Sequence, residues 1–210
     1  MTYGQVRDLT LQLINRYSVA GTQVAEHYNN QADYLARIPG LVNDAMMEIA
    51  TTVRPIFAEY DLDANTGRSY GDGWVAFDMP NDFFRIAGGG VPRFRKRRYH
   101  RFSQFRWLGE STLLIREKAL ADELFVEYYR YPVQLPAQPD DETPLDNVPV
   151  THSALAYYAA AQLMMQDDAF QYATLYNKYE DKLSKMIPAP YTEPVITEDV
   201  YSACEWGELY

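Results

Sequence analysis

The sequence predicts a mainly α fold with inserted β structure: an up-and-down helical bundle interrupted by a small antiparallel β region and followed by an extended C-terminal tail. Three observations support this fold class. Apolar residues recur at helical spacing near both ends, short β-type runs fill the middle, and prolines cluster between residues 132 and 149. With 210 residues, 47% of them hydrophobic, the chain can bury a core without a disulfide or structural metal.

Two helices are expected in the first 60 residues. The first covers residues 2–21 and begins with a possible capping box of Thr2 and Gln5. The second covers residues 31–52 and ends before the proline at position 55. Because proline lacks an N–H group and clashes with the preceding turn, Pro39-Gly40 predicts a break or kink in it.

The middle of the chain has the sequence pattern of an antiparallel β meander, with short strand-like runs separated by turn residues. Turn residues at 61–67 introduce it, and Gly88-Gly89-Gly90 and Gly109-Glu110 punctuate it. Closely spaced strands joined by short turns favour antiparallel pairing. The expected strands are residues 74–79, 83–87, 97–101, 104–108, 112–116 and 124–131.

A connector and two more helices follow. Residues 132–149 hold five prolines and four acidic residues and are expected to be extended. Thr151 is a good N-cap for a helix that runs to about Gln166, and Asp167-Asp168 is a break or the cap of the next helix. That helix, 169–186, carries a stripe that predicts a seam against a partner helix. The stripe consists of Tyr172, Tyr176, Tyr179, Leu183 and Met186.

These elements divide the chain into three expected parts. Residues 1–60 with 149–187 form the helical bundle, and residues 61–148 form the β insertion and the Pro-rich connector. Residues 188–210 form a tail for partner docking. From 190 onward the chain has five acidic residues, no Lys or Arg, and eight large apolar residues. A solvated linker has no need of so many apolar side chains, so we expect this segment to pack on its own domain or on another surface.

No motif for catalysis, cofactor binding or metal binding is found. Cys204 is the only cysteine, which excludes an intramolecular disulfide and a Cys-based zinc site. His27, His100 and His152 lie in separate contexts without ligand spacing. Residues 61–72 match a calcium loop at three positions but lack its glycine and its final glutamate, so a turn explains them. We expect no cofactor and no enzymatic activity; an enzyme would need a site built from scattered residues.

Charge and tyrosine content point toward protein interfaces. A net charge of −10 argues against nonspecific binding to nucleic acid or to anionic membranes. The 18 tyrosines favour protein contact surfaces, although they also suit a core. Neither a signal peptide nor an apolar stretch of membrane-spanning length is visible, so we expect a soluble protein without a membrane partner.

One stretch, 93–106, reverses the overall charge. It holds seven basic residues and no acid, interleaved with aromatic residues. Three interpretations compete: pairing with acidic residues within or between subunits, contact with nucleic acid phosphates, and a solvated hairpin. The basic residues are Arg93, Arg95, Lys96, Arg97, Arg98, Arg101 and Arg106.

The order of these segments resembles the head–tail adaptor, or connector, proteins of tailed bacteriophages. The likeness is strongest over residues 123–187 and extends in general architecture to about 1–187. It is carried by Tyr128-Tyr129-Arg130-Tyr131-Pro132, the Pro/Asp connector, and the run from Pro149 to Tyr158 that leads into two closing helices. These patterns contain no catalytic residues.

The resemblance implies a structural virion protein at the head–tail junction, made in the host bacterial cytoplasm. Family members form a homo-oligomeric ring, usually of twelve copies, below the portal protein and give tail or stopper proteins a docking surface. The ring continues the channel through which double-stranded DNA passes without sequence-specific contact during genome ejection. C-terminal segments of the family reach into the portal; the matching apolar residues here are Tyr191, Val195, Ile196, Val200, Tyr201, Trp206 and Tyr210. The alternative function is a nucleic-acid-binding module that uses the basic hairpin 93–106.

Overall fold

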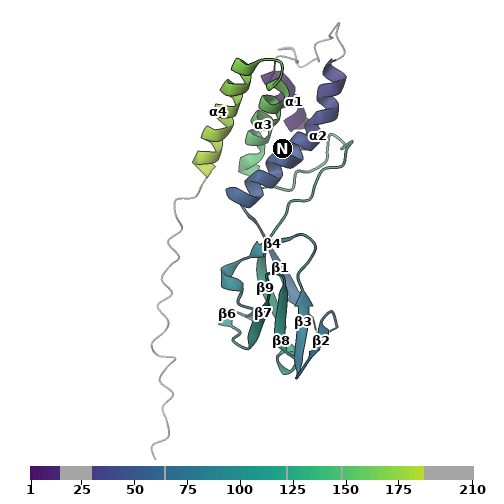
Figure 1. Cartoon of the computed structure of the whole chain (residues 1–210), viewed down its shortest axis with the longest axis vertical. Helices are drawn as coiled ribbons and strands as arrows, with labels where there is room; N and C mark the ends of the chain where they lie inside the picture. Colours follow the sequence, from purple (N-terminus) through teal and green to yellow (C-terminus); the bar gives the residue numbers. More distant parts are fainter. Residues whose placement is uncertain (15–29, 64, 122, 148, 187–210) are drawn as a thin grey trace, which may run out of the picture.

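The computed structural model describes residues 1–14, 30–63, 65–121, 123–147 and 149–186. Its helices gather at one end of the molecule and its strands at the other (Figure 1). The helices are α1 Tyr3–Leu13, α2 Asn30–Thr52, α3 His152–Met164 and α4 Ala169–Met186, with short 3₁₀ turns η1 Gly88–Gly90, η2 Glu117–Ala121 and η3 Pro149–Thr151.

The described strands form two antiparallel sheets. The five-stranded sheet has the order β1-β9-β5-β6, and β4 also pairs with β9. Its strands are β1 Ile56–Leu62, β4 Phe83–Ile86, β5 Arg93–Phe94, β6 Arg97–Arg101 and β9 Leu124–Arg130. The four-stranded sheet has the order β2-β3-β8-β7. Its strands are β2 Arg68–Gly71, β3 Trp74–Asp78, β7 Phe105–Leu108 and β8 Thr112–Arg116.

The chain therefore has a mixed α+β fold, and the predicted helical bundle with a small β insertion was wrong. The two sheets share a hydrophobic core of their own, separate from that of the helices. Leu62 and Val126 of the five-stranded sheet and Phe77 and Leu113 of the other are all nearly inaccessible to solvent. Although its sequence lies between α2 and α3, a β unit of two sheets that encloses its own core is a second folding layer beside the helices.

Each of the six predicted strands is present, but the predicted meander is not. Strand β9 pairs with β1, β4 and β5, which come from three separate parts of the sequence. Three strands were missed: β1, β2 and β5. In β1 only alternate residues approach the core and charged residues occupy much of the remainder, while every residue of β2 is exposed and β5 has two residues. Such strands show no apolar run.

The helical core explains why α2 stays continuous through Pro39, where a break or kink was predicted. Ile38 and Val42, on either side of Pro39, are fully buried in the core that α2 forms with α3 and α4. Burial on both sides offsets the hydrogen bond that proline cannot donate. The helix ends at Thr52, three residues before Pro55, as predicted.

The last two helices pack as the α4 stripe predicts. Tyr179 is fully buried, and its ring meets that of Tyr158 of α3 edge-on at 5.2 Å. Asp168 caps α4, because its Oδ1 accepts hydrogen bonds from the backbone N–H groups of Phe170 and Gln171, both at 3.0 Å. Thr151 lies at the N-cap position of α3, as predicted, but it is buried. Its side chain makes no capping hydrogen bond to the helix, contrary to the prediction.

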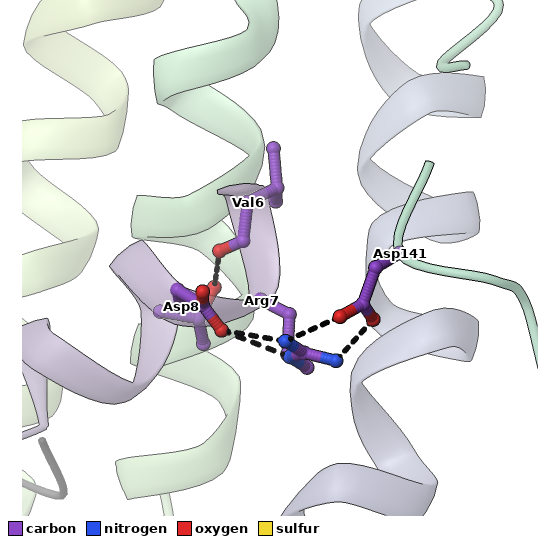
Figure 2. A network of polar contacts seen from close by, with 5 residues as sticks. Val6, Arg7, Asp8 and Asp141 are labelled. Carbon is purple, nitrogen blue, oxygen red and sulfur yellow. Dashed lines mark hydrogen bonds and ion pairs between the residues drawn. The ribbon is translucent and has the colours of Figure 1, made fainter. Parts of the chain in front are cut away.

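The connector, residues 131–147, is attached along α1 and α2. The backbone N–H groups of Tyr3 and Gly4 donate to carbonyl oxygens of Thr143 and Asp141 at 2.9 and 3.0 Å. Figure 2 shows the Arg7 guanidinium between the carboxylates of Asp8 and Asp141, with hydrogen bonds to both. These contacts, together with two hydrogen bonds between Asn43 and Leu135, hold an otherwise irregular segment against the helices.

Candidate interaction surfaces

The basic stretch crosses both sheets, and three of its members pair with acids of the same chain. Arg93 lies 3.1 Å from Glu127, and Lys96 lies 3.4 Å from Glu123. Arg95 bonds both Glu59, at 2.5 Å, and Asp61 of β1. For these three residues the structure shows pairing within the chain.

The register of the five-stranded sheet brings these charges together. Phe57, Glu59 and Asp61 alternate along β1 and face outward on the same side as Glu127 of β9. Arg95 reaches them across Phe125, with its guanidinium 4.5 Å from the ring centre, and Phe125 is 1% exposed. The hydrogen bonds that Arg95 donates to the two acids, Asp61 foremost, raise the pKa of Arg95. The arginine thus covers an aromatic ring and neutralises two carboxylates.

Neither Arg101 nor Arg106 is among the ion pairs of this cluster. Arg97 and Arg98 lie on β6, but the structure does not describe their side chains. Arg101 ends β6 and is exposed. Arg106 lies on β7 of the other sheet, 5.7 Å from the ring centre of Trp74. The basic stretch is therefore divided between strands of two different sheets.

Sequence reasoning missed an aromatic patch on the five-stranded sheet, where β1 begins and β9 ends. Phe57 is 51% exposed and meets Tyr129 edge-on at 6.3 Å. Arg85 of β4 lies 5.0 Å from the centre of the Tyr129 ring and 5.4 Å from that of Phe84. Alternation along β1 was the available signal, but it appears only once β1 is recognised as a strand that begins directly after Pro55.

The predicted portal-binding residues lie outside the described part of the chain. They are Tyr191, Val195, Ile196, Val200, Tyr201, Trp206 and Tyr210, all within residues 187–210. Cys204 lies in the same segment.

The described residues offer little chemistry beyond charge and aromatic contacts. A hollow of about 450 Å³ in the connector is lined by residues 133–136 and 143–146, and its only titratable group, Asp146, is bonded to Arg130. No group of three or more His, Cys, Asp and Glu in the described ranges is placed to hold a metal ion. The turn interpretation is confirmed for residues 65–66, between β1 and β2, where the Asn65 backbone N–H donates to Asp63 Oδ1 at 2.9 Å; Asp61 and Leu62 of the predicted turn belong to β1.

His152 is the first residue of α3, directly after the predicted N-cap Thr151. It is 4% exposed, and burial lowers the pKa of its imidazole below the usual 6.5. Its Nε2 lies 3.2 Å from the carbonyl oxygen of Asn147, and its Nδ1 lies 2.8 Å from the amino group of Met1. The first contact joins the start of α3 to the end of the connector, and the second joins it to Met1.

Comparison with known proteins agrees with the resemblance seen in the sequence. Residues 1–198, which include all the helices and strands described above, match the family of the SU10 adaptor protein. No curated protein matches the chain. Among the described helices, none is both long and apolar enough to cross a bilayer. The chain belongs to the SU10 adaptor protein family, a family of structural head–tail adaptors of phages.

Proposed function

We propose that this protein forms the adaptor ring between the capsid portal and the tail and continues the DNA channel. The observation that carries the proposal is the family match over residues 1–198, because it spans both the helical and the strand-bearing part of the chain. Function in such a protein is assembly, so the residues that matter are those that meet other chains. A homo-oligomer of about twelve copies, the portal protein and tail or stopper proteins are the expected partners, at the head–tail junction of the virion.

Each part of the chain has a role in this proposal. Residues 1–60 and 149–187 would surround the channel and residues 61–148 would supply subunit and tail-side contacts, while 188–210 would dock on the portal. An acidic chain of net charge −10 suits a wall along which double-stranded DNA slides without sequence-specific contact. Synthesis would take place in the host bacterial cytoplasm, before assembly.

The in-chain ion pairs favour this proposal over the nucleic-acid-binding module. Arg93, Arg95 and Lys96 already face carboxylates of β1, β9 and the residue before β9. A phosphate would have to compete with those carboxylates, which lowers the affinity that these cations offer to DNA. A role at a subunit interface needs no such exchange, since the rim of an interface is polar and can keep these ion pairs.

Portal attachment by the C-terminal segment is the first step to test. Full-length protein and a variant lacking residues 190–210 are mixed with purified portal rings and separated by sedimentation. The truncated variant should keep its circular dichroism spectrum and lose attachment, because its aromatic anchors are gone. A matched control keeps the segment but replaces its five acids by their amides, and it should still attach if aromatic residues provide most of the binding.

Two outcomes have distinct meanings. Undiminished attachment by the truncated variant contradicts the role given to the tail while leaving the ring proposal intact. Failure of the full-length protein to bind the portal and tail proteins contradicts the proposed function itself.

A further inference from the structure

Charge is distributed unevenly between the two layers of this protein. Residues 56–130, which form the two sheets, hold 12 of the 19 Lys and Arg but 11 of the 29 Asp and Glu. The rest of the chain therefore has seven basic and 18 acidic residues. All of the excess negative charge belongs to the helices, the connector and the terminal segment, whereas the sheets are nearly neutral overall.

Several arginines lie on the outward side of the four-stranded sheet, and the proposed function gives them no role so far. The register places Arg68, Ala76, Leu114 and Arg106 side by side across the four strands. Trp74 lies opposite Arg116 on the two central strands, two residues along from that row. We call this surface the Trp74 face, formed by Arg68, Trp74, Asp78, Arg106, Leu108 and Arg116.

The Trp74 ring holds two of the arginines in place. The guanidinium carbons of Arg116 and Arg106 lie 4.2 and 5.7 Å from the ring centre, and Arg116 Nη1 also donates to the carbonyl oxygen of Asp72 at 2.6 Å. Both arginines are exposed, and neither has an acidic side-chain partner among the described residues. Cations fixed in this way lose little freedom when they bind a partner.

The rest of the face has the composition of a protein interface. Leu108 is 45% exposed at the edge of the sheet. The single acid on the face, Asp78, lies 3.6 Å from Arg68, and both side chains are 64% exposed. Tryptophan and arginine are among the residue types enriched where a few residues dominate protein binding energy.

We propose that the Trp74 face binds a second copy of this chain through that copy's acidic helical layer. The proposal rests on the ring of the proposed function and names one of its two contact surfaces. Two different patches that meet head to tail generate a ring, and opposite charge fixes which patch meets which. The exposed acidic side chains available on the helical layer and connector include Asp33, Asp44, Asp140, Glu142 and Glu180.

Nucleic acid fits this face less well. The Arg116 guanidinium covers the Trp74 ring, so a base has no free aromatic surface on which to stack. A chain of net charge −10 also repels a polyanion at long range, and two arginines without acidic partners are few for phosphate binding. An acidic protein surface, by contrast, can bind this face through only a few ion pairs.

Native mass spectrometry of the full-length chain over a concentration series, alone and with portal rings, tests the proposal. The test variant carries Arg106→Glu and Arg116→Glu. The control carries Arg101→Glu and Lys118→Glu, which change the net charge equally at two exposed positions, on β6 and η2, outside both the Trp74 face and the helical layer. The test variant should need at least ten times more protein than wild type to assemble, whereas the control should assemble like wild type.

A second measurement guards against a variant that misfolds. A photoreactive amino acid in place of Leu108 should form cross-links between copies, to peptides from 30–54 or 131–186. Assembly of the test variant at wild-type concentrations, or cross-links confined to one chain, overturns the proposal. So does a wild-type chain that stays monomeric with and without portal, and that outcome would contradict the proposed ring as well. A ring that the test variant still forms on the portal at wild-type concentrations leaves the proposed function intact, and this inference alone fails.

The same variants decide between protein and nucleic acid. A labelled 30-base-pair duplex should bind wild type, test variant and control equally weakly. Duplex binding that the wild type shows and only the test variant loses would assign the Trp74 face to DNA and overturn the proposal.

Discussion

Arg130 and Asp146 close the connector into a loop. The guanidinium at the end of β9 donates two hydrogen bonds to the carboxylate, at 2.6 and 2.7 Å, and the backbone N–H of Val133 donates a third at 2.7 Å. The chain leaves the sheets at Arg130 and enters η3 and α3 soon after Asp146. This bidentate pair therefore lies where the helical and strand layers join, and only about a quarter of each side chain is exposed.

Substitution Asp146→Asn should destabilise the fold by about 1–3 kcal/mol, because a partly buried arginine then loses its charged acceptor. Urea denaturation monitored by tryptophan fluorescence measures the change. Asp141→Asn is the matched control: it also removes an aspartate bonded to an arginine, but that carboxylate is 60% exposed. A smaller loss, below about 1 kcal/mol, is expected there. Equal losses for the two variants would show that the Arg130 pair has no special role.

The same pair predicts how stability changes in acid. Hydrogen bonding from Arg130 lowers the pKa of Asp146 below its usual 3.8. A carboxyl with a depressed pKa in the folded state contributes stability above its unfolded pKa and loses it as pH falls through the folded value. Wild type should therefore lose stability below about pH 4, relative to Asp146→Asn. The difference between their free energies of unfolding, measured from pH 6 to pH 2.5, should shrink as pH falls; a constant difference would contradict the assignment.

Local elements of this fold could be predicted, and the pairing between distant strands could not. The predicted bounds 169–186 are those of α4, since an apolar stripe and a capping aspartate are both local signals. By contrast, β1 and β9 pair across the whole β region, from Ile56 with Arg130 to Leu62 with Leu124. The periodicity of apolar residues indicates which residues face a core, but it does not indicate which strands pair. The size of the β layer and its separate core could therefore not be predicted.

In the candidate interaction surfaces, too, local features could be predicted from the sequence and contacts between distant residues could not. The basic stretch was visible as composition, but the partners of Arg95 are 34 and 36 residues away in sequence. They become neighbours only through the register of β1, β9 and β5. The Trp74 face was invisible for a similar reason, because Trp74, Arg106 and Arg116 come from three strands.

Among the tyrosines of the α4 stripe, loss of the Tyr172 hydroxyl should destabilise the fold less than loss of the Tyr179 hydroxyl. Tyr179 donates a hydrogen bond to Glu48 Oε2 at 2.8 Å, and burial followed by this bond raises the pKa of Tyr179. Tyr179→Phe should cost about 1–2 kcal/mol, since a carboxylate loses its donor. Tyr172→Phe removes a hydroxyl without a hydrogen bond among the described residues and should cost under about 0.5 kcal/mol. Thermal unfolding measures the effect of each variant. Equal shifts of the melting temperature would mean that the hydrogen bond to Glu48 adds no net stability.

The glycine turn before β5 gives a test of packing that separates backbone strain from steric contact. Gly89 and Gly90 both adopt left-handed conformations, with φ of 73° and 69°. A methyl group on Gly89 would meet nothing within 4 Å, whereas one on Gly90 would lie 2.7 Å from Ile86 Cγ2 and 2.8 Å from Trp107 Nε1. Gly89→Ala should therefore cost only the left-handed strain, about 1–2 kcal/mol.

Gly90→Ala adds a collision to the same strain. Trp107 Nε1 donates to the Gly90 carbonyl oxygen at 2.9 Å, so a displaced indole also weakens that hydrogen bond. We expect Gly90→Ala to destabilise by at least about 2 kcal/mol more than Gly89→Ala. The near-ultraviolet circular dichroism of the tryptophans should change only in the Gly90 variant. Equal unfolding free energies for the two variants would mean that Trp107 moves aside freely, and that this turn does not fix the edge of the four-stranded sheet.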